Sequence, residues 1–207
     1  MEDTSKSKPT VRARAKTIKA FRCKNLIAVI ENPDDIGNIG VVIRNVNALG
    51  AEKAYIVTSK NLLPDTWSEM RSTPKLNSIS ASAIKWSFVK IFPDTNSCMD
   101  HLERNNFVSV VTSPHRKECR NIALHEHDYT QHKKLAVWFG NEKRGISATA
   151  VERSEFCINI PMYGVIESLN LGTSSGIVLY EITKQRRAFQ LKLERKIAAK
   201  KFRNNAA

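Results

Sequence analysis

A strand–helix–strand unit near the start of the chain places the strongest constraint on its fold. Residues 26–30 and 54–57 are short apolar runs rich in branched side chains, which is typical of buried strands. Between them, the turn-forming residues 31–37 precede a segment with helical periodicity, in which we expect Asn38 to be the N-cap and Gly50 to end the helix. Two strands joined through a helix run parallel to each other. The unit therefore predicts an α/β fold.

The alternation of strands and helices continues along the rest of the chain. Its 207 residues are enough for one domain with its own core. We expect further strands at residues 86–92, 107–112, 135–139 and 156–160, and helices at residues 94–105 and 169–187. The sequence thus predicts a parallel sheet flanked by helices, a fold in which ligands bind at the carboxyl ends of the strands.

The excess positive charge of the chain lies at its two ends. The net charge is +13, yet residues 25–183 hold sixteen basic and seventeen acidic residues. Residues 1–24 hold eight basic and two acidic residues, and residues 184–207 hold nine basic and one acidic residue. Such ends are either solvated tails or arms that bind the phosphates of a polyanion. We therefore divide the chain into a basic extension (1–24), a central domain (25–187) and a second basic extension (188–207).

Several classes of protein are disfavoured by what the sequence lacks. The longest apolar runs are too short to span a bilayer, and the N-terminus has no apolar segment of the secretory type, although its basic character leaves a targeting segment conceivable. His125, His127 and His132 have no acidic or cysteine partner at the spacing of metal ligands. The four cysteines form no redox or metal motif. We expect a cytoplasmic protein with reduced thiols, without a membrane span or a metal.

Two motifs follow the expected strands at residues 26–30 and 135–139. In the first, Asn38 stands at the head of a helix and Arg44 lies nearly two turns further on. A helix cap with a solvent-facing arginine and a phosphate-binding turn are both compatible with this pattern. In the second, Gly140 and Gly145 flank Glu142, so that a ligand can approach the backbone and a carboxylate can orient a neighbouring group. Taken alone, this motif is equally compatible with an ordinary strand-to-helix turn.

The third motif follows the last expected strand. Ile160-Pro-Met162 leads through a glycine-containing loop to Ser168-Leu-Asn170, which opens the final helix. The exposed backbone groups of such a loop could bind the edge of an adenine ring. Ser168 or Asn170 could equally cap the helix, and a capping role does not prevent contact with a substrate.

Together, the three motifs resemble those of the SpoU, or TrmH-like, branch of the SPOUT RNA methyltransferases. Each motif is moderately specific, but their order and spacing make the joint signal strong, and the resemblance extends from about residue 26 to residue 187. The run of residues 139–146 and the continuation at 179–187 are most similar to the tRNA guanosine-2′-O-methyltransferases. The matching residues are Asn38 and Arg44, then Gly140, Glu142 and Gly145, then Ile160, Pro161, Met162, Ser168, Leu169 and Asn170.

The resemblance implies both a fold and a reaction. The fold is an α/β domain with a deep C-terminal trefoil knot, found in homodimers, and the reaction is methyl transfer from S-adenosylmethionine to a ribose 2′-OH of RNA, with tRNA favoured over rRNA. Arg44 would reach a site completed by the partner subunit, where it would act either as the base or as a clamp for the RNA phosphate. The implied cofactor-binding residues are Thr112, Gly140, Ile160 and Leu169, and the implied catalytic residues are Arg44, Asn38, Glu142, Ser168 and Asn170.

One departure from the family pattern and two other classes of protein remain. Where the family usually has Val-Ser-Val-Ala after Ser-Leu-Asn, this chain has a run with glycines at 172 and 176, which could loosen the helix or allow tighter packing. A dinucleotide-dependent oxidoreductase is disfavoured because the G-x-G-x-x-G pattern is incomplete. A catalytically silent RNA-binding protein fits the basic ends, but it leaves the cofactor motifs unexplained.

Overall fold

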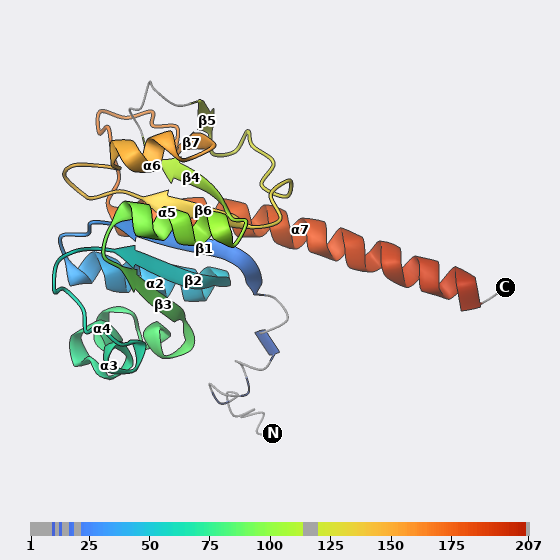
Figure 1. Cartoon of the computed structure of the whole chain (residues 1–207). Helices are drawn as coiled ribbons and strands as arrows, with labels where there is room; N and C mark the ends of the chain where they lie inside the picture. Colours follow the sequence, from blue (N-terminus) through green and yellow to red (C-terminus); the bar gives the residue numbers. More distant parts are fainter. Residues whose placement is uncertain (1–9, 11–12, 14–16, 19–21, 114–119, 206–207) are drawn as a thin grey trace, which may run out of the picture.

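A parallel sheet forms the centre of the molecule, as predicted, and it has seven strands, one more than the six expected from the sequence (Figure 1). The computed structural model describes residues 10, 13, 17–18, 22–113 and 120–205. Within this part of the chain the strand order is β3-β2-β1-β6-β4-β7-β5. The strands are β1 (Cys23–Glu31), β2 (Ala51–Val57), β3 (Phe88–Phe92), β4 (Val108–Thr112), β5 (Asn121–Ala123), β6 (Leu135–Phe139) and β7 (Phe156–Asn159).

Helices cover both faces of the sheet and bury two apolar clusters against it. Ile39, Leu76 and Leu179 belong to the cluster on one face, whereas Met99 and Val151 belong to the cluster on the other. Among the described residues no helix combines the length and apolar character that a membrane span requires. The helices are α2 (Ile36–Leu49), α3 (Trp67–Ser72), α4 (Pro74–Ile79), the 3₁₀ helix η2 (Ala83–Trp86), α5 (Thr95–Arg104), α6 (Ala148–Glu152) and α7 (Leu171–Asn205).

The start of α2 differs from the prediction. The helix begins at Ile36, with Asp35 as its extended N-cap residue, so that Asn38 lies inside the first turn and is not the cap. The amide of Asn38 is instead engaged by other loops, which sequence pattern alone could not reveal. The predicted end is confirmed, because Gly50 adopts the left-handed conformation with φ 81°.

Short elements account for the other differences. Helices α3, α4 and α6 and strand β5 were not predicted, since three to six residues do not establish a period. Trp86, which was assigned to a strand, ends η2 instead. Strand β3 therefore begins at Phe88.

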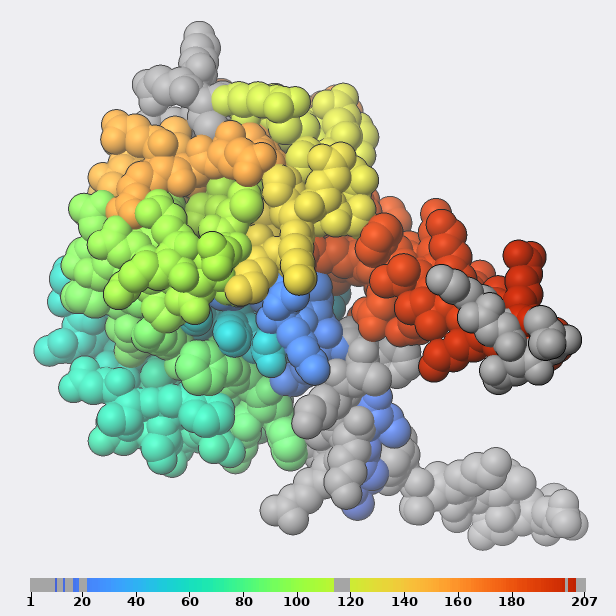
Figure 2. Space-filling view, turned by 45° about the vertical axis from the view of Figure 1, so that its right-hand side comes forward, coloured from blue at the N-terminus to red at the C-terminus, as the bar shows by residue number. Residues whose placement is uncertain are grey.

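Helix α7 is much longer than the predicted helix at 169–187. Its first half packs on the body, where Arg186 donates hydrogen bonds to the backbone oxygens of Asn25 (3.2 Å), Tyr129 (3.2 Å) and His132 (2.5 Å). Its second half projects from the body (Figures 1 and 2), and the side chains from Ala188 to Ala199 are exposed. The helix runs without interruption through residue 187, where the sequence suggested that the domain ends.

Candidate active site

A cavity of about 650 Å³ opens at the carboxyl ends of the adjacent strands β6, β4 and β7. This is the edge of a parallel sheet at which ligands bind, and the volume lies within the range of small-molecule sites. All four residues predicted to bind a cofactor line it: Thr112, Gly140, Ile160 and Leu169. Glu142 and Ser168 of the predicted catalytic set also line it.

The second motif forms a closed turn around a buried asparagine. The side-chain oxygen of Asn141 accepts hydrogen bonds from the backbone N–H groups of Lys143 (2.9 Å) and Arg144 (2.8 Å). The backbones of Asn141 and Gly145 bond to each other in both directions at 2.9 Å. The side-chain amide of Asn141 donates to the backbone oxygen of Asn32 at 2.6 Å. Asn141 was not singled out from the sequence, and the loop that it orders forms one wall of the cavity.

Gly140 is required by its own loop. A Cβ atom at this position would lie 2.3 Å from the carbonyl carbon of Gly145 and 2.4 Å from the backbone nitrogen of Ile146. From the sequence, a side chain at position 140 was expected to block the approach of a ligand to the backbone. In the structure, it would clash first with the backbone of its own turn.

Substitution of Gly140 by alanine is therefore expected to abolish measurable S-adenosylhomocysteine binding by deforming this turn. Isothermal titration of the purified variant measures the effect. Gly176→Ala is the matched control, because Gly176 does not line the cavity and a Cβ there would meet nothing closer than 3.4 Å. Parent-like affinity in the Gly140 variant would remove the turn from the binding site.

Glu142 connects the first and second motifs. Its Oε1 accepts a hydrogen bond from the side-chain amide of Asn38 at 2.6 Å, and its Oε2 accepts one from the backbone N–H of Asp34 at 3.3 Å. Lys60 Nζ lies 2.6 Å from Asp34 Oδ1, and the hydrogen bond from Lys60 lowers the pKa of Asp34 to about 2. Asp34 therefore stays ionised near neutral pH. Through its bonds to Asn38 and Asp34, Glu142 fixes the position of the second-motif loop relative to the start of α2.

Asn170 adds the third motif to this network. Its side-chain amide donates to Asn38 Oδ1 at 3.3 Å, and its Oδ1 accepts from the backbone N–H of Gly172 at 2.8 Å. The second bond caps the start of α7, so the capping interpretation of Asn170 is confirmed. Asn38, Glu142 and Asn170 come from three separate segments and meet at the rim of the cavity.

Arg44 is placed differently from the other predicted site residues. It is exposed on α2 and is not among the residues that line the cavity. Its neighbour Asn45 faces α7 and donates hydrogen bonds to Gly172 O (2.7 Å) and Ser175 Oγ (3.0 Å). In the described part of the chain the guanidinium of Arg44 has no hydrogen-bond or ion-pair partner. It is therefore available to a group from outside the protomer.

The glycines that depart from the family pattern lie where α7 packs against α2. A Cβ at Gly172 would lie 2.5 Å from Val41 Cγ1, and one at Gly176 would lie 3.4 Å from the side-chain nitrogen of Asn45. Of the two possibilities left open by the sequence, the structure favours closer packing of the helices at Gly172, whereas a Cβ at Gly176 would make an ordinary contact.

Glu31, at the end of β1, was missed by the sequence reasoning. Its side chain is 1% exposed and is held by Thr95 Oγ1 (2.5 Å), Ser147 Oγ (2.6 Å) and Ser147 N (2.8 Å), each donating to the carboxylate. Ser147 follows the second motif and caps α6. Glu31 therefore fixes the far end of the loop that forms the cavity wall. The only feature of the sequence that could have indicated this role is the position of an acidic residue directly after the apolar run 26–30.

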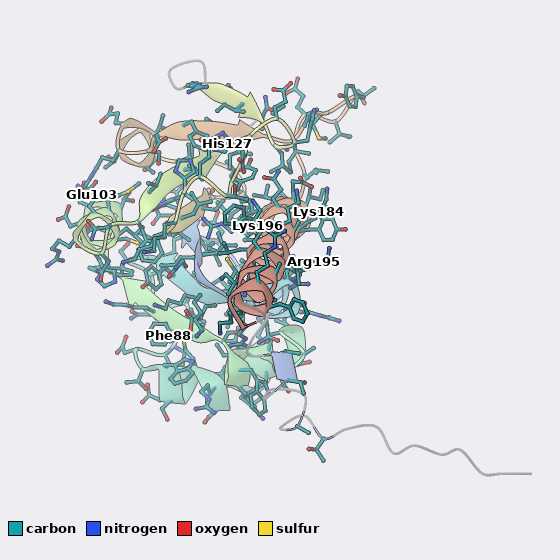
Figure 3. All side chains as sticks on the ribbon, turned by 90° about the vertical axis from the view of Figure 1, so that its right-hand side faces the viewer. Phe88, Glu103, His127, Lys184, Arg195 and Lys196 are labelled. Carbon is teal, nitrogen blue, oxygen red and sulfur yellow. The ribbon has the colours of Figure 1, made fainter. Side chains whose placement is uncertain are left out.

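Glu31→Gln is expected to lower the free energy of unfolding by about 1–3 kcal/mol, because an amide nitrogen cannot accept the hydrogen bonds that the carboxylate accepts. Urea denaturation measures this change, and titration should show weaker S-adenosylhomocysteine binding. Glu103→Gln is the control: Glu103 pairs with Arg153 at 2.8 Å but is 53% exposed (Figure 3), so its loss should cost less than about 1 kcal/mol. Equal effects of the two substitutions would contradict the role of Glu31.

Within the described ranges there is no group of three or more histidine, cysteine, aspartate or glutamate side chains that could hold a metal ion. His127 and His132 do meet, with their Nε2 atoms 3.1 Å apart, and they pack on Phe156. Burial lowers the pKa of His127, which favours the neutral ring. The cluster is therefore part of the packing beneath α7.

The fold and the three joined motifs define a methyltransferase of the SpoU type, and the chain belongs to the SpoU rRNA Methylase family, whose model matches residues 25–180. Among curated proteins, it is 29% identical over 175 residues to the tRNA (guanosine(18)-2′-O)-methyltransferase of Thermus thermophilus, covering 84% of this chain and 82% of the relative. The corresponding enzyme of Escherichia coli is 28% identical over 180 residues, covering 86% and 71%.

Solved structures agree with this assignment. The Aquifex aeolicus TrmH/SpoU tRNA modifying enzyme superposes with a TM-score of 0.70 at 28% identity, covering 86% of this chain and 85% of that one. The SpoU methyltransferase AviRb from Streptomyces viridochromogenes, solved with AdoMet, gives a TM-score of 0.67 at 24% identity, covering 80% and 62%. The second likeness concerns the fold alone. The trefoil knot implied by the resemblance stays a prediction.

Proposed function

We propose that this protein transfers a methyl group from S-adenosylmethionine to a ribose 2′-OH of RNA, with a guanosine of tRNA as the favoured substrate. The observation that carries the proposal is the cavity at the ends of β4, β6 and β7, which is lined by all four predicted cofactor-binding residues. Membership of a methylase family and relatives named as tRNA guanosine methyltransferases support the same reaction. The free thiols of Cys23, Cys98 and Cys157 fit a reducing compartment such as the cytoplasm.

The residues around the cavity fit such a cofactor. Its walls combine apolar side chains, including Ile146, Ile158 and Leu171, with the accessible backbone of the second and third motifs. Gly140 allows the tight turn of the second motif, and the N–H and C=O groups of these loops can bind the adenosine part. The cofactor would supply an electrophilic methyl group, and the protein would supply orientation. Holding the ribose oxygen in line with that methyl group lowers the barrier by converting an encounter into an intramolecular step.

The residues at the rim would position the RNA. Glu142, Asn38 and Asn170 form a preorganised chain of hydrogen bonds, and Ser168 lies at the edge of the cavity. Arg44 would either accept the proton of the 2′-OH or hold the adjacent phosphate. The second role suits a guanidinium, which keeps its positive charge in proteins.

Arg44 lies outside the cavity of its own protomer, and we therefore propose a homodimer in which Arg44 of the partner subunit completes each site. The loop of the third motif exposes Tyr163 (94%), Val165 (97%) and Ile166 (68%) beside the cavity. Next to it lies an apolar groove of about 420 Å³ lined by residues that include Pro161 and Ile177. The apolar positions of this part of α7 are Ile177, Val178, Leu179 and Ile182. Of these only Ile177, which is 39% exposed, can contribute to the interface, because the other three are buried within the protomer.

Subunit mixing tests this arrangement. Arg44→Ala and Gly140→Ala chains should each be inactive, but a mixed dimer should regain one complete site and thus measurable activity. Val165→Asp should yield a monomer in sedimentation, because it places a charge in the proposed interface. A fully active monomer at micromolar concentration would overturn the dimer without affecting the proposed reaction.

The function itself is tested with isotope-labelled S-adenosylmethionine. The protein is incubated with unfractionated tRNA or rRNA, and the RNA is digested to nucleosides for mass spectrometry. We expect label in 2′-O-methylguanosine from tRNA. Label found only in rRNA would favour the alternative substrate. The absence of label from both, with RNA binding retained, would favour the catalytically silent RNA-binding protein.

A further inference from the structure

A cluster of exposed aromatic rings lies at the end of the sheet opposite the cavity. Trp86 ends η2 and is 38% exposed, and Phe88 begins the edge strand β3 and is 43% exposed. Trp67, on α3, packs beside Phe88 with ring centroids 6.0 Å apart. Because all strands are parallel, the start of β3, where Phe88 lies, is at the amino ends of the strands (Figures 1 and 3). The cavity lies at their carboxyl ends. We call Trp67, Trp86 and Phe88 the aromatic platform.

Three cations surround the aromatic platform. The guanidinium of Arg71 lies 4.7 Å from the ring centre of Trp67, and Lys53 Nζ lies 6.0 Å from that of Phe88. Arg22 donates a hydrogen bond from Nη2 to the backbone oxygen of Trp86 at 2.9 Å. Glu69, on the same short helix as Arg71, is engaged in a capping box with Thr66. The surface thus combines aromatic faces with positive charge.

The platform is also held rigidly. The indole N–H of Trp67 donates to the backbone oxygen of Ser87 at 3.0 Å, and Ser87 Oγ accepts from the side-chain amide of Asn47 at 3.2 Å. Ser87 is 1% exposed and separates the two exposed rings. These bonds fix the ring of Trp67 and the backbone between Trp86 and Phe88 before any ligand binds, which reduces the entropic cost of binding.

We propose that the aromatic platform stacks unpaired bases of the RNA substrate while the surrounding cations bind its phosphates. This inference rests on the proposed function. Bases stack on aromatic rings irrespective of their sequence, and positive side chains beside the rings neutralise the backbone. An apolar protein partner would leave Arg22, Lys53 and Arg71 without counter-charges, so the charge of this surface favours a polyanion.

The position of the platform has a consequence for the size of the substrate. In the sheet, β3 is separated from β6 by β2 and β1, which at roughly 4.8 Å per strand spacing amounts to about 14 Å. The five residues of β3 add about 16 Å along the strands. One RNA that contacts both the platform and the cavity must therefore extend over about 20 Å. A folded, full-length tRNA can do so, whereas a dinucleotide that contains the methylated nucleotide is too short.

The experiment compares two double variants of the full chain. Trp86→Leu with Phe88→Leu keeps apolar side chains but removes the aromatic faces, and Trp86→Tyr with Phe88→Tyr keeps the faces. For unfractionated tRNA, we expect the leucine pair to raise KM and Kd by about tenfold or more with kcat unchanged, and the tyrosine pair to behave like the parent. On the dinucleotide, all three proteins should have equal kcat/KM. Binding of S-adenosylhomocysteine should be the same throughout.

The possible outcomes separate this inference from the function on which it rests. If the parent methylates tRNA and the leucine pair shows the same KM, the platform does not bind RNA and the proposed function stands. If the leucine pair changes the sedimentation coefficient and leaves KM unaltered, the surface is a contact between copies of the chain, and the inference is overturned. If the parent neither methylates nor binds RNA, both proposals are wrong. Quenching of Trp86 emission by tRNA, absent in a Trp86→Phe variant, would support the stacking directly.

Discussion

Arg44→Ala is expected to lower kcat for methyl transfer by at least about 100-fold while leaving S-adenosylhomocysteine affinity unchanged. Arg44 does not line the cavity, so its loss cannot remove a cofactor contact. In the proposed dimer its guanidinium contacts the reacting ribose or the adjacent phosphate, and losing a contact made mainly in the transition state lowers kcat and not ground-state binding. Steady-state kinetics and isothermal titration on the same preparation measure the two effects.

Two further variants sharpen this test. Arg44→Lys should not restore activity, because a point charge lacks the planar fork of the guanidinium. Arg104→Ala, which removes an exposed arginine from α5 on the other side of the sheet, should retain parent activity. Because Arg44 is exposed, its replacement should change the free energy of unfolding by less than about 0.5 kcal/mol, and lost activity then cannot be ascribed to unfolding. Turnover within a few-fold of the parent would exclude Arg44 from the reaction.

Removal of both basic extensions is expected to weaken RNA binding by roughly 100-fold or more at moderate salt. Deletion of residues 1–20 and 188–207 removes twelve lysines and arginines. Each phosphate contact contributes about −0.7 to −0.9 to the slope of log K against log salt. If about half of the twelve touch phosphate, the slope should become less steep by about 4 to 5. Filter binding at several salt concentrations, with parent and truncated protein side by side, measures this change.

Truncation at residue 187 keeps the contacts that hold α7 against the body of the protein. Arg186, which ties α7 to the backbone oxygens of Asn25, Tyr129 and His132, is retained, and the buried Leu179 and Ile182 also remain. The truncated protein should therefore bind S-adenosylhomocysteine like the parent. A full-length variant with Lys192, Arg195 and Lys196 replaced by glutamine keeps the helix and removes part of the charge, and it should show an intermediate slope. An identical slope for the parent and the truncated protein would mean that the extensions are merely solvated.

The sequence by itself determined six of the seven strands in the described part of the chain and the location of the loops that line the cavity. Apolar runs such as residues 26–30 and 135–139 are local signals, and their alternation with helices requires a parallel sheet. The carboxyl ends of parallel strands meet at one edge, and so Gly140 and Ile160, each directly after a strand, were correctly expected near a common site. The long C-terminal helix was also correctly expected, although its extension to Asn205 was not.

Tertiary structure alone decided which side chains meet. Glu142, Asn38 and Asn170 are more than a hundred residues apart in two of their pairings, and a hydrogen bond between such positions leaves no periodic trace in a sequence. The same holds for Glu31, whose carboxylate is buried only because Thr95 and Ser147 fold over it. The chain order of the strands also does not reveal that β6 inserts between β1 and β4, the arrangement that brings the three loops together. Local sequence fixes the elements through short-range sterics and burial, whereas the site depends on contacts between segments that only the packed sheet brings within bonding distance.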